Sequence, residues 1–540
     1  MMSDAKNKVF VIGLDGATWD VLTPLMHEGK MPFLRQMTER AATSNLESTI
    51  PPMTGCAWTS FQTGLTPGNH GIFHFVKFDR ASKELRFVNS SSLKSKTIWE
   101  IASEFDKKVI SINVPMTYPP LRVNGMMISG IPIPSQNAGI AYPNGLYQEI
   151  LDHVKEYKAV IHQHVYFSRG LDYFVDQLIQ TIENRKKTAL YLLKNYEWDL
   201  FMVHFQSVDV LQHALWNIII NSPGTSEREK AKVYTFYERL DEIIARLFEE
   251  IDDTTTAVIM SDHGFGGDKK VFYINTWLMN EGLLVPHKRL KASTFSSQVA
   301  NFLRKVDKRR LRSIFFKTHK RRAFILNEVN NIIDWSVTSA LAVTVGPYAL
   351  LFLNSGAEGQ DSEAQLRERI IKKLGKITDP SSGNQIMSEV LFKEQIYQGA
   401  SVGESPDMVC VAKNGYSFDF HLDTSRRAVL QDLDSVYQPP GSHRTDGILL
   451  LVGNSVSKNS TLISPRIFDL APTILFTLGV PIPRSMEGRV LTEAFTPEFL
   501  KTSKPMIRDI NIDRSESSGY DFSSEEEMQI HRSLKGLGYF

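Results

Sequence analysis

The chain has little cysteine and no long apolar run. Only two cysteines, Cys56 and Cys410, occur in 540 residues, and no CxxC pair is present. A disulfide framework and a cysteine-ligated zinc or iron–sulfur site are therefore excluded. No apolar run reaches the roughly eighteen residues that a membrane-spanning helix needs. The first residues, MMSDAKNKVFVIGLDG, lack the apolar segment and cleavage site of a secretory signal, so we predict a cytoplasmic protein.

An excess of charge of either sign is also absent. Lys and Arg number 61 against 60 Asp and Glu, which leaves a formal charge of +1. The overall charge therefore favours neither nucleic acid nor an anionic surface, and we expect no nucleic-acid partner. At 540 residues the chain is long enough for one large domain that carries insertions.

Short apolar runs alternate with amphipathic helical patterns along the chain. The runs are apolar throughout and bounded by turn residues, as is typical of strands buried in a parallel sheet. They occupy residues 9–14, 109–114, 200–205, 257–261, 349–353, 408–412 and 448–452. Helical patterns cover residues 174–195 and 234–251. We therefore predict an α/β fold, a three-layer α/β/α sandwich with a mostly parallel central sheet.

One segment departs from this alternation. Residues 287–322 hold thirteen Lys and Arg and a single acid, Asp307, with apolar residues at helical spacing. We predict a helical basic insertion over residues 287–334. Two interpretations remain open: its basic face is solvated, or it is a cap that attracts an anionic substrate or contacts an anionic membrane surface.

The predicted domains follow from these segments. A core of residues 1–286 and 335–496 surrounds the insertion, and a tail follows at 497–540. In the tail, the SSEEE run at 523–527 predicts a helix start, with serine as cap and acids in the first turn. We expect the last dozen or so residues to dock on the core as a helix.

Acids and histidines stand where predicted strands end. Asp15, Asp209 and Asp262 each follow a predicted strand directly or within a few residues. Because ligands bind beyond the carboxyl ends of the strands in open α/β sheets, these acids should converge on one crevice. The histidines that accompany them are His213, His263 and His443. Together they form a mixed Asp/His set that suits Zn²⁺ or Mn²⁺.

Each of these patterns also has a purely structural interpretation. Asp15 can be a turn residue before Gly16. Asp209 and His213 can be a surface pair on one face of a helix. The SDHG block at 261–264 is harder to explain structurally, because Asp and His stand together between a buried strand and a glycine.

A block rich in Gly, Pro and Thr lies at residues 51–75. It predicts a loop that leads into a helix beginning near Thr54, where unpaired backbone N–H groups and the positive dipole end favour an anion. The Thr54 hydroxyl either caps this helix or serves as a nucleophile, and the residues alone leave both interpretations open.

Several blocks, in this order, resemble the type I phosphodiesterase/nucleotide pyrophosphatase branch of the alkaline phosphatase superfamily. They are LDG at 14–16, the threonine block at 51–75, Asp209 with His213, SDHG at 261–264, INTWLMNEGLL at 274–284, GSHRTDG at 441–447 and FDLAPTILFTLGVPIPRSMEGRVL at 468–491. The resemblance covers most of the chain. It implies an alkaline phosphatase-like fold and a metal-dependent hydrolase of phosphate esters.

The resemblance also implies a metal centre with a threonine nucleophile. Two divalent ions, Zn²⁺ or alternatively Mn²⁺, are expected on two groups of residues: Asp209, His213 and His443 for one, and Asp15, Asp262, His263 and the Thr54 hydroxyl for the other. Thr54 is then the residue that forms a phospho-threonine intermediate. A sulfatase would need a CxPxR-type setting, and Cys56 is followed by Ala57 and Trp58 instead.

One position departs from the family pattern. Nucleotide pyrophosphatases commonly have an asparagine three residues after the nucleophile, and this chain has Ala57 there. A specificity for nucleotides is therefore not implied. Gly55 and Asn113, the second at the end of the predicted strand 109–114, are the candidates for contacting phosphate.

We expect a phosphodiesterase or pyrophosphatase that acts on a small or lipid-linked phosphate ester. A phosphomutase or phosphomonoesterase with the same metal centre is an alternative, for which residues 287–322 would supply the extra cations that a monoester needs. A non-catalytic metal-binding protein of the same fold is a third reading, and the intact set of ligands argues against it.

Overall fold

The structure is a computed structural model that describes residues 7–287, 332–355, 362–422, 429–433, 439–514 and 519–539. The basic insertion predicted over 287–334 lies almost wholly outside these residues, so its fold and role stay predictions. The division into core, insertion and tail also stays a prediction. Among the described residues, the helices are all too short or too polar to cross a membrane.

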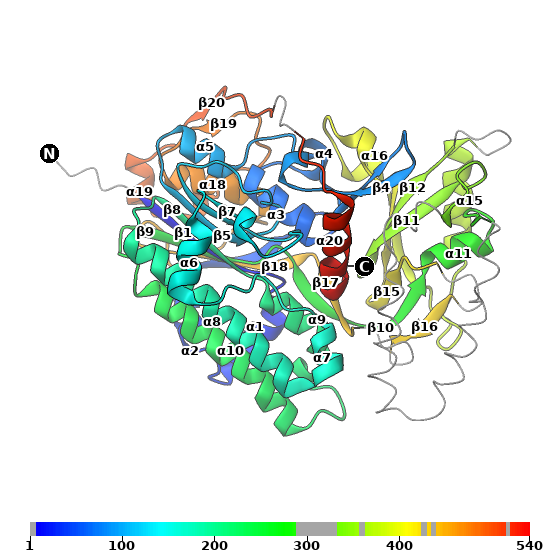
Figure 1. Ribbon diagram of the computed structural model, residues 1–540, viewed down its shortest axis with the longest axis horizontal. Helices are drawn as coiled ribbons and strands as arrows, with labels where there is room; N and C mark the ends of the chain where they lie inside the picture. The colour runs from blue at the N-terminus through cyan, green and yellow to red at the C-terminus, as the bar shows by residue number, and fades with distance from the viewer. Residues whose placement is uncertain are drawn as a thin grey trace.

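An eight-stranded sheet forms the centre of the larger lobe, on the left in Figure 1. Its strands, in spatial order, are β2 (Ala42–Glu47), β18 (Asp446–Val452), β9 (Thr255–Met260), β1 (Lys8–Leu14), β8 (Leu200–Phe205), β5 (Val109–Val114), β6 (Gly125–Ser129) and β7 (Ala141–Tyr142). The run from β9 to β6 is parallel, whereas β18 and β7 are antiparallel to their neighbours. The predicted mostly parallel central sheet is confirmed.

Side chains alternate along the central strands and bury two cores. On β1, Phe10 and Ile12 face one core, and Val9 and Val11 face the other, as the two-residue period of a strand requires. The first core is covered by α1 (Trp19–His27), α2 (Pro32–Thr38), α8 (Leu171–Asn195) and α10 (Glu227–Phe248). The second is covered by α3 (Thr54–Thr63), α5 (Ile98–Glu104) and α18 (Leu470–Thr477). The three-layer sandwich follows from this two-sided burial.

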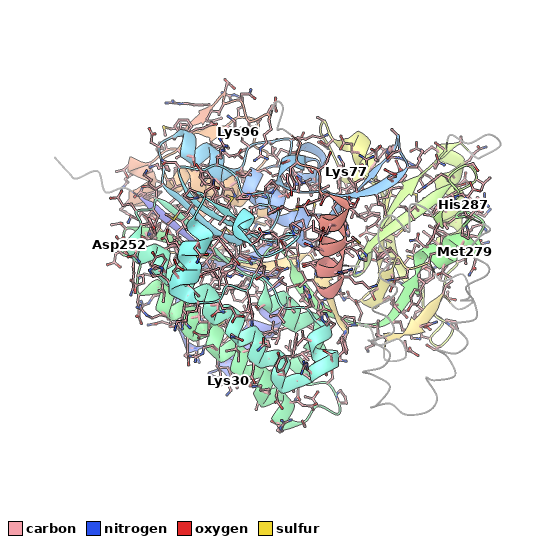
Figure 2. All side chains as sticks on the ribbon, viewed as in Figure 1. Lys30, Lys77, Lys96, Asp252, Met279 and His287 are labelled. Atoms are coloured by element: carbon pink, nitrogen blue, oxygen red, sulfur yellow. The ribbon has the colours of Figure 1, made fainter. Side chains whose placement is uncertain are left out.

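A second lobe carries two smaller sheets. One is antiparallel and consists of β11 (Ala340–Val345), β12 (Tyr348–Leu353), β14 (Met408–Ala412) and β13 (Met387–Phe392). The other consists of β15 (Gly415–Asp419), β10 (Gly264–Tyr273) and β16 (Leu430–Asp432), with β17 (Gly441–Arg444) paired to β10. Met279, in α11 (Ile274–Asn280), and His287 lie at the outer edge of this lobe (Figure 2).

The prediction of parallel direction was wrong for three of the apolar runs. The runs at 349–353 and 408–412 lie in the antiparallel sheet of the second lobe, and the run at 448–452 is antiparallel to β9. A continuous apolar run reports burial of both faces of a strand and carries no information on direction.

The C-terminal helix α20 (Ser524–Gly536) lies between the sandwich and the second lobe in Figure 1, drawn in red. It begins with a capping box in which Ser523 and Glu526 satisfy each other's backbone N–H groups. Its buried face is formed by Ile530 and Leu534, and Leu537 follows at 0% exposure. The segment is therefore anchored by apolar contacts along its length.

Candidate active site

Three adjacent parallel strands place the predicted acids at one edge of the central sheet. In the order β9, β1, β8, the first is followed by Asp262, the second by Asp15, and the third by α9 (Ser207–Ile219), which carries Asp209. Histidine His443 comes from β17, where it is the register partner of Phe265 on β10. Thr54 is the first residue of α3. All seven predicted site residues are buried: Asp15, Thr54, Asp209, His213, Asp262, His263 and His443.

Six of the seven residues form two overlapping groups. In one, Asp209 Oδ1 lies 3.3 Å from Nε2 of both His213 and His443. In the other, atoms of Asp15, Asp209 and His263 lie within 4.8 Å of one another. Asp262 lies next to this second group, since its Oδ2 is 3.4 Å from His263 Nε2. Asp209 therefore takes part in both groups, whereas the sequence resemblance places it in one only.

Backbone carbonyls fix the three imidazoles. His213 Nδ1 lies 2.8 Å from Gly441 O, His443 Nδ1 lies 3.0 Å from Pro52 O, and His263 Nδ1 lies 3.0 Å from Gly264 O. Because a carbonyl can only accept, each Nδ1 carries a proton, and the neutral form of each imidazole turns its Nε2 lone pair to the cluster. The Nε2 atoms of His213 and His443 are 3.0 Å apart, so two neutral imidazoles would bring two lone pairs together there, a contact that a cation would make favourable.

The carboxylates are also arranged to suit a cation. Four of their oxygens have no hydrogen-bond partner among the described residues, although all are buried: Asp15 Oδ1, Asp209 Oδ1, Asp209 Oδ2 and Asp262 Oδ2. Burial raises the pKa of Asp15 and, together with the charge of Asp15, raises the pKa of Asp262 well above its usual value. Burial also lowers the pKa of His263 and of His443 to about 4. Neutral imidazoles beside carboxylates that resist ionisation form a set that divalent ions fit.

Asp209 differs from the other two acids. Burial alone would raise its pKa, but the neighbouring His213 and His443 hold the pKa well below the usual value. Burial opposes protonation of His213, yet the charge of Asp209 keeps the pKa of this histidine above its usual value. Asp209 is therefore the carboxylate most readily ionised at neutral pH in this cluster.

The Thr54 hydroxyl faces the cluster and does not cap its helix. The residue at the cap position of α3 is Met53, whose sulfur accepts from Gly55 N at 3.1 Å. Thr54 Oγ1 lies 3.3 Å from His263 Nε2 and 2.6 Å from the hydroxyl of Tyr539. Of the two interpretations that the sequence leaves open, the capping one does not describe this geometry.

Cys56 is no competitor of Thr54. Its thiol is at 0% exposure, and burial raises its pKa to about 12. The side chain packs within the first core, so it offers no thiolate at neutral pH.

Two buried side chains that the sequence did not single out support Asp15. Trp58 Nε1 donates to Asp15 Oδ2 at 3.1 Å, and His204 Nε2 lies 2.9 Å from the same oxygen. Gly16, with φ of 67°, donates its N–H to Asp262 Oδ1 at 3.2 Å, so the turn after Asp15 also orients the second acid. His204 lies inside the apolar run of β8 and Trp58 inside α3, where the pattern indicates core packing alone.

Replacing Trp58 with phenylalanine should weaken metal binding at Asp15. The ring volume is largely kept, but the donor that orients Asp15 is lost, and such outer contacts typically contribute about 10–100-fold in metal affinity. Competition of Zn²⁺ with a chelating dye would measure the change. Trp99→Phe is the matched control, because Trp99 is equally buried and donates Nε1 to Gln62 at 3.1 Å, in the same core. Equal Zn²⁺ affinity in the Trp58 variant and wild type would contradict this role.

Of the two candidates for contacting phosphate, Asn113 has the free polar group. It lies at the carboxyl end of β5, next to β8, with φ of 63° at an irregularity in the pairing with β6. Its side chain is 1% exposed, and neither amide atom has a hydrogen-bond partner in the described ranges. Gly55 is less available, because its N–H is already directed at the Met53 sulfur.

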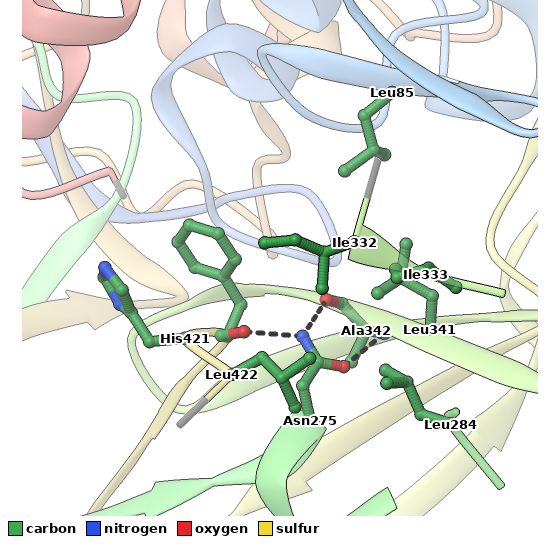
Figure 3. Close-up of a pocket in the computed structure, with 10 residues that line it drawn as sticks. Leu85, Asn275, Leu284, Ile332, Ile333, Leu341, Ala342, His421 and Leu422 are labelled. Carbon is green, nitrogen blue, oxygen red and sulfur yellow. Dashed lines mark hydrogen bonds between the residues drawn. The ribbon is translucent and has the colours of Figure 1, made fainter. Parts of the chain in front are cut away.

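A cavity elsewhere in the molecule has no comparable chemistry. It measures about 20 Å³ and is lined mainly by apolar side chains of the second lobe, including Leu284, Ile333 and Leu341 (Figure 3). The amide of Asn275 is used fully by Ala342 N, Ala342 O and Phe420 O. The space suits about one water molecule and no phosphate ester.

The three-layer fold and the buried Asp/His cluster together suit a metal-dependent hydrolase. The profile of the type I phosphodiesterase / nucleotide pyrophosphatase family matches residues 9–443, and the chain belongs to this family. The resemblance inferred from the sequence is confirmed, and with it a metal-dependent enzyme that hydrolyses phosphoric esters. No curated protein matches the chain as a relative.

Solved structures share the fold at low sequence identity. Phosphonoacetate hydrolase from Sinorhizobium meliloti 1021, in complex with phosphonoformate, has a TM-score of 0.55 at 16% identity, over 88% of this chain and 96% of that one. Human ectonucleotide pyrophosphatase / phosphodiesterase 5 has a TM-score of 0.51 at 14% identity, over 90% and 98%. An inactive threonine-to-alanine variant of murine ectonucleotide pyrophosphatase / phosphodiesterase 5, in complex with AMP, has a TM-score of 0.50 at 13% identity, over 88% of this chain and 95% of that one.

Proposed function

We propose that the protein is a two-metal hydrolase of phosphoric diesters or pyrophosphates with Thr54 as its nucleophile. The observation that carries the proposal is the position of the Thr54 hydroxyl. It opens α3 at 0% exposure, 3.3 Å from His263 Nε2, beside a cluster of buried carboxylates. A hydroxyl without a capping role in such a place is suited to lose its proton and attack phosphorus.

The proposal assigns one ion to each group of ligands. Asp209, His213 and His443 would hold the first ion, and Asp15, Asp262 and His263, with the Thr54 hydroxyl, would hold the second; Asp209 takes part in both groups. Zn²⁺ is proposed for both positions, with Mn²⁺ as the alternative, because both ions accept imidazole and carboxylate. When bound, such ions act as Lewis acids that favour the deprotonated hydroxyl and neutralise charge on phosphoryl oxygens.

Thr54 carries the covalent chemistry. Its Oγ attacks phosphorus in line, a Thr54 Oγ–P bond forms, and the bond to the first alcohol breaks, with the alcohol leaving in protonated form. Water then attacks the phospho-threonine, the Oγ–P bond breaks, and the Thr54 hydroxyl is restored. The positive dipole end of α3 favours the charged phosphoryl group in both steps, and Asn113 is proposed to donate an amide N–H to one of its oxygens.

The contacts of Arg444, the cationic residue next to His443 in the sequence, favour a diester substrate over a monoester. Arg444 follows His443 directly, but it donates to Asp268 Oδ1 at 2.8 Å and to Ser442 at 2.8 Å. It therefore does not offer the free guanidinium that a dianionic monoester would need. The complex of the murine relative with AMP supports a nucleotide or nucleotide-like ester as one substrate class, and Ala57 indicates that contacts to it differ here. A lipid-linked ester and a cytoplasmic location stay predictions.

Hydrolysis of bis(4-nitrophenyl) phosphate tests the proposed function. Wild-type protein stripped with a chelator should be inactive and should recover activity on addition of Zn²⁺ or Mn²⁺. 4-Nitrophenyl phosphate, measured in parallel, should be the poorer substrate, because the guanidinium of Arg444 is already paired with Asp268. A folded, metal-loaded sample that turns over only the monoester would instead favour a phosphomonoesterase or mutase.

A further inference from the structure

We propose that Tyr539 of the C-terminal segment completes the active site, as a hydrogen-bond donor to the reacting oxygens and as a wall that limits the size of the ester. This inference rests on the proposed role of Thr54 and goes beyond it. The carrying observation is a hydrogen bond of 2.6 Å between the Tyr539 and Thr54 hydroxyls, across 485 positions of sequence. Tyr539 is 2% exposed, so it is an internal part of the site.

The segment before Tyr539 is built to hold this position. Gln163 holds the C-terminal end of helix α20 through two hydrogen bonds. Its backbone N–H donates to Gly536 O and its side-chain Nε2 donates to Leu537 O, each at 2.6 Å. Gly538 then turns the chain with φ of 94°, where an added Cβ would lie 2.6 Å from Gln163 Nε2. A non-glycine residue would be strained there, so the turn that directs Tyr539 inward depends on this glycine.

The Tyr539 hydroxyl has to be the donor during the reaction. Either hydroxyl can donate in the resting pair, but a deprotonated Thr54 oxygen can only accept. A group 2.6 Å from Thr54 Oγ1 is also within reach of an oxygen of the phosphoryl group that this atom attacks. Tyr539 can therefore stabilise charge on the entering oxygen or on a non-bridging oxygen, where charge develops in the transition state.

The Tyr539 ring limits the space above the first turn of α3. It packs edge-on against Phe75, with ring centroids 4.9 Å apart, and lies 6.0 Å from the ring of His443. Phe75 in turn lies against Gly55, where an added Cβ would be 3.0 Å from its ring. These rings, together with Thr54, enclose the side of the site where the alcohol substituent that stays on the phosphorus of a diester would lie. A small substituent fits this arrangement better than a bulky one.

Two substitutions separate the hydrogen bond from the wall. Tyr539→Phe keeps the ring and removes the hydroxyl; it should lower kcat by about 10²-fold for methyl 4-nitrophenyl phosphate and bis(4-nitrophenyl) phosphate alike. Orthovanadate, which mimics the transferred phosphoryl group, should bind more weakly by a similar factor. Tyr539→Ala should show the same loss and, in addition, raise the kcat/KM ratio of the bulky to the small diester by about tenfold or more.

A second tyrosine of the same segment is the control. Tyr520 bonds to Glu526 at 2.5 Å and to Tyr118 at 3.3 Å, away from Thr54, so Tyr520→Phe should leave kcat and vanadate binding unchanged. Should Tyr539→Ala fail to fold, Tyr539→Leu fills more of the space and carries the same expected shift in the ratio.

Several results would overturn the inference. A Tyr539→Phe variant as active as wild type would exclude the donor role, and a more active one would show that the segment obstructs the site. An unchanged ratio of the two diesters in the alanine and leucine variants would exclude the wall. Failure of the proposed function is distinct from all of these, because wild-type protein would then release no nitrophenol from either diester.

Discussion

Replacing Thr54 with alanine is expected to abolish turnover, by roughly 10⁴-fold or more, while the metal ions stay bound. The hydroxyl is the proposed attacking group, and it lies 3.3 Å from the imidazole of His263. The carboxylates and imidazoles do not depend on it, since each imidazole is oriented by a backbone carbonyl. The measurements are steady-state hydrolysis of bis(4-nitrophenyl) phosphate and metal content of the purified variant.

A second threonine on the same helix provides the control for this substitution. Thr59 is also at 0% exposure, but its hydroxyl donates to Gly55 O of its own helix at 2.6 Å. Thr59→Ala should therefore lose little activity. Mass spectrometry after an acid quench should detect a peptide phosphorylated on Thr54 in the wild-type protein. The corresponding peptide of the Thr54→Ala variant should carry no phosphate. Substantial turnover by the Thr54 variant would mean that the nucleophile is another group.

Asp209→Asn is expected to remove both metal ions at once and to reduce activity about as severely as Thr54→Ala. Asp209 takes part in both groups of ligands, and neither of its oxygens has a hydrogen-bond partner among the residues that the structure describes. Asparagine keeps the shape but removes the charge that balances two cations. Asp15→Asn should be milder in metal content, because Asp15 belongs to one group only. Elemental analysis should therefore give close to two ions per chain for wild type, one for Asp15→Asn and none for Asp209→Asn.

Thermal unfolding provides a second readout for Asp209→Asn. A ligand that binds only the folded state adds about 2.7 kcal/mol when present at a hundred times its Kd, so chelation should lower the Tm of wild type. The Tm of the variant should not respond to chelator. Asp241→Asn is the control, because Asp241 is a buried carboxylate that accepts from Phe33 N and Leu34 N, outside the cluster. A variant that retains two ions would contradict the proposed role of Asp209 in both groups of ligands.

The sequence predicted the strands better than their arrangement. The runs at 109–114, 200–205 and 408–412 coincide with β5, β8 and β14, because continuous apolar segments bounded by turn residues report burial directly. The order in which strands pair, and their direction, depends on contacts between distant segments that hydropathy does not encode. The placement of β9, β1 and β8 side by side therefore had to come from the three-dimensional structure.

The same division holds for the site. Asp15, Asp209 and Asp262 could be predicted to meet because the carboxyl ends of parallel strands share one edge of a sheet. Tyr539 could not, since a tyrosine near the end of a polar tail has no motif, and its partner is 485 positions away. His204 was equally hidden, because a histidine within an apolar strand has the pattern of a core residue.

The orientation of the three imidazoles by Gly441, Pro52 and Gly264 carbonyls has a consequence for how this enzyme can change. A point mutation alters side chains and leaves main-chain oxygens in place, so no single substitution removes the groups that orient these imidazoles. The carboxylate of Asp15 is held by the side chains of Trp58 and His204 instead. Selection or laboratory evolution for a different metal or pH range would therefore act mainly on the side chains that hold Asp15. The orientation of the three histidines would stay unchanged.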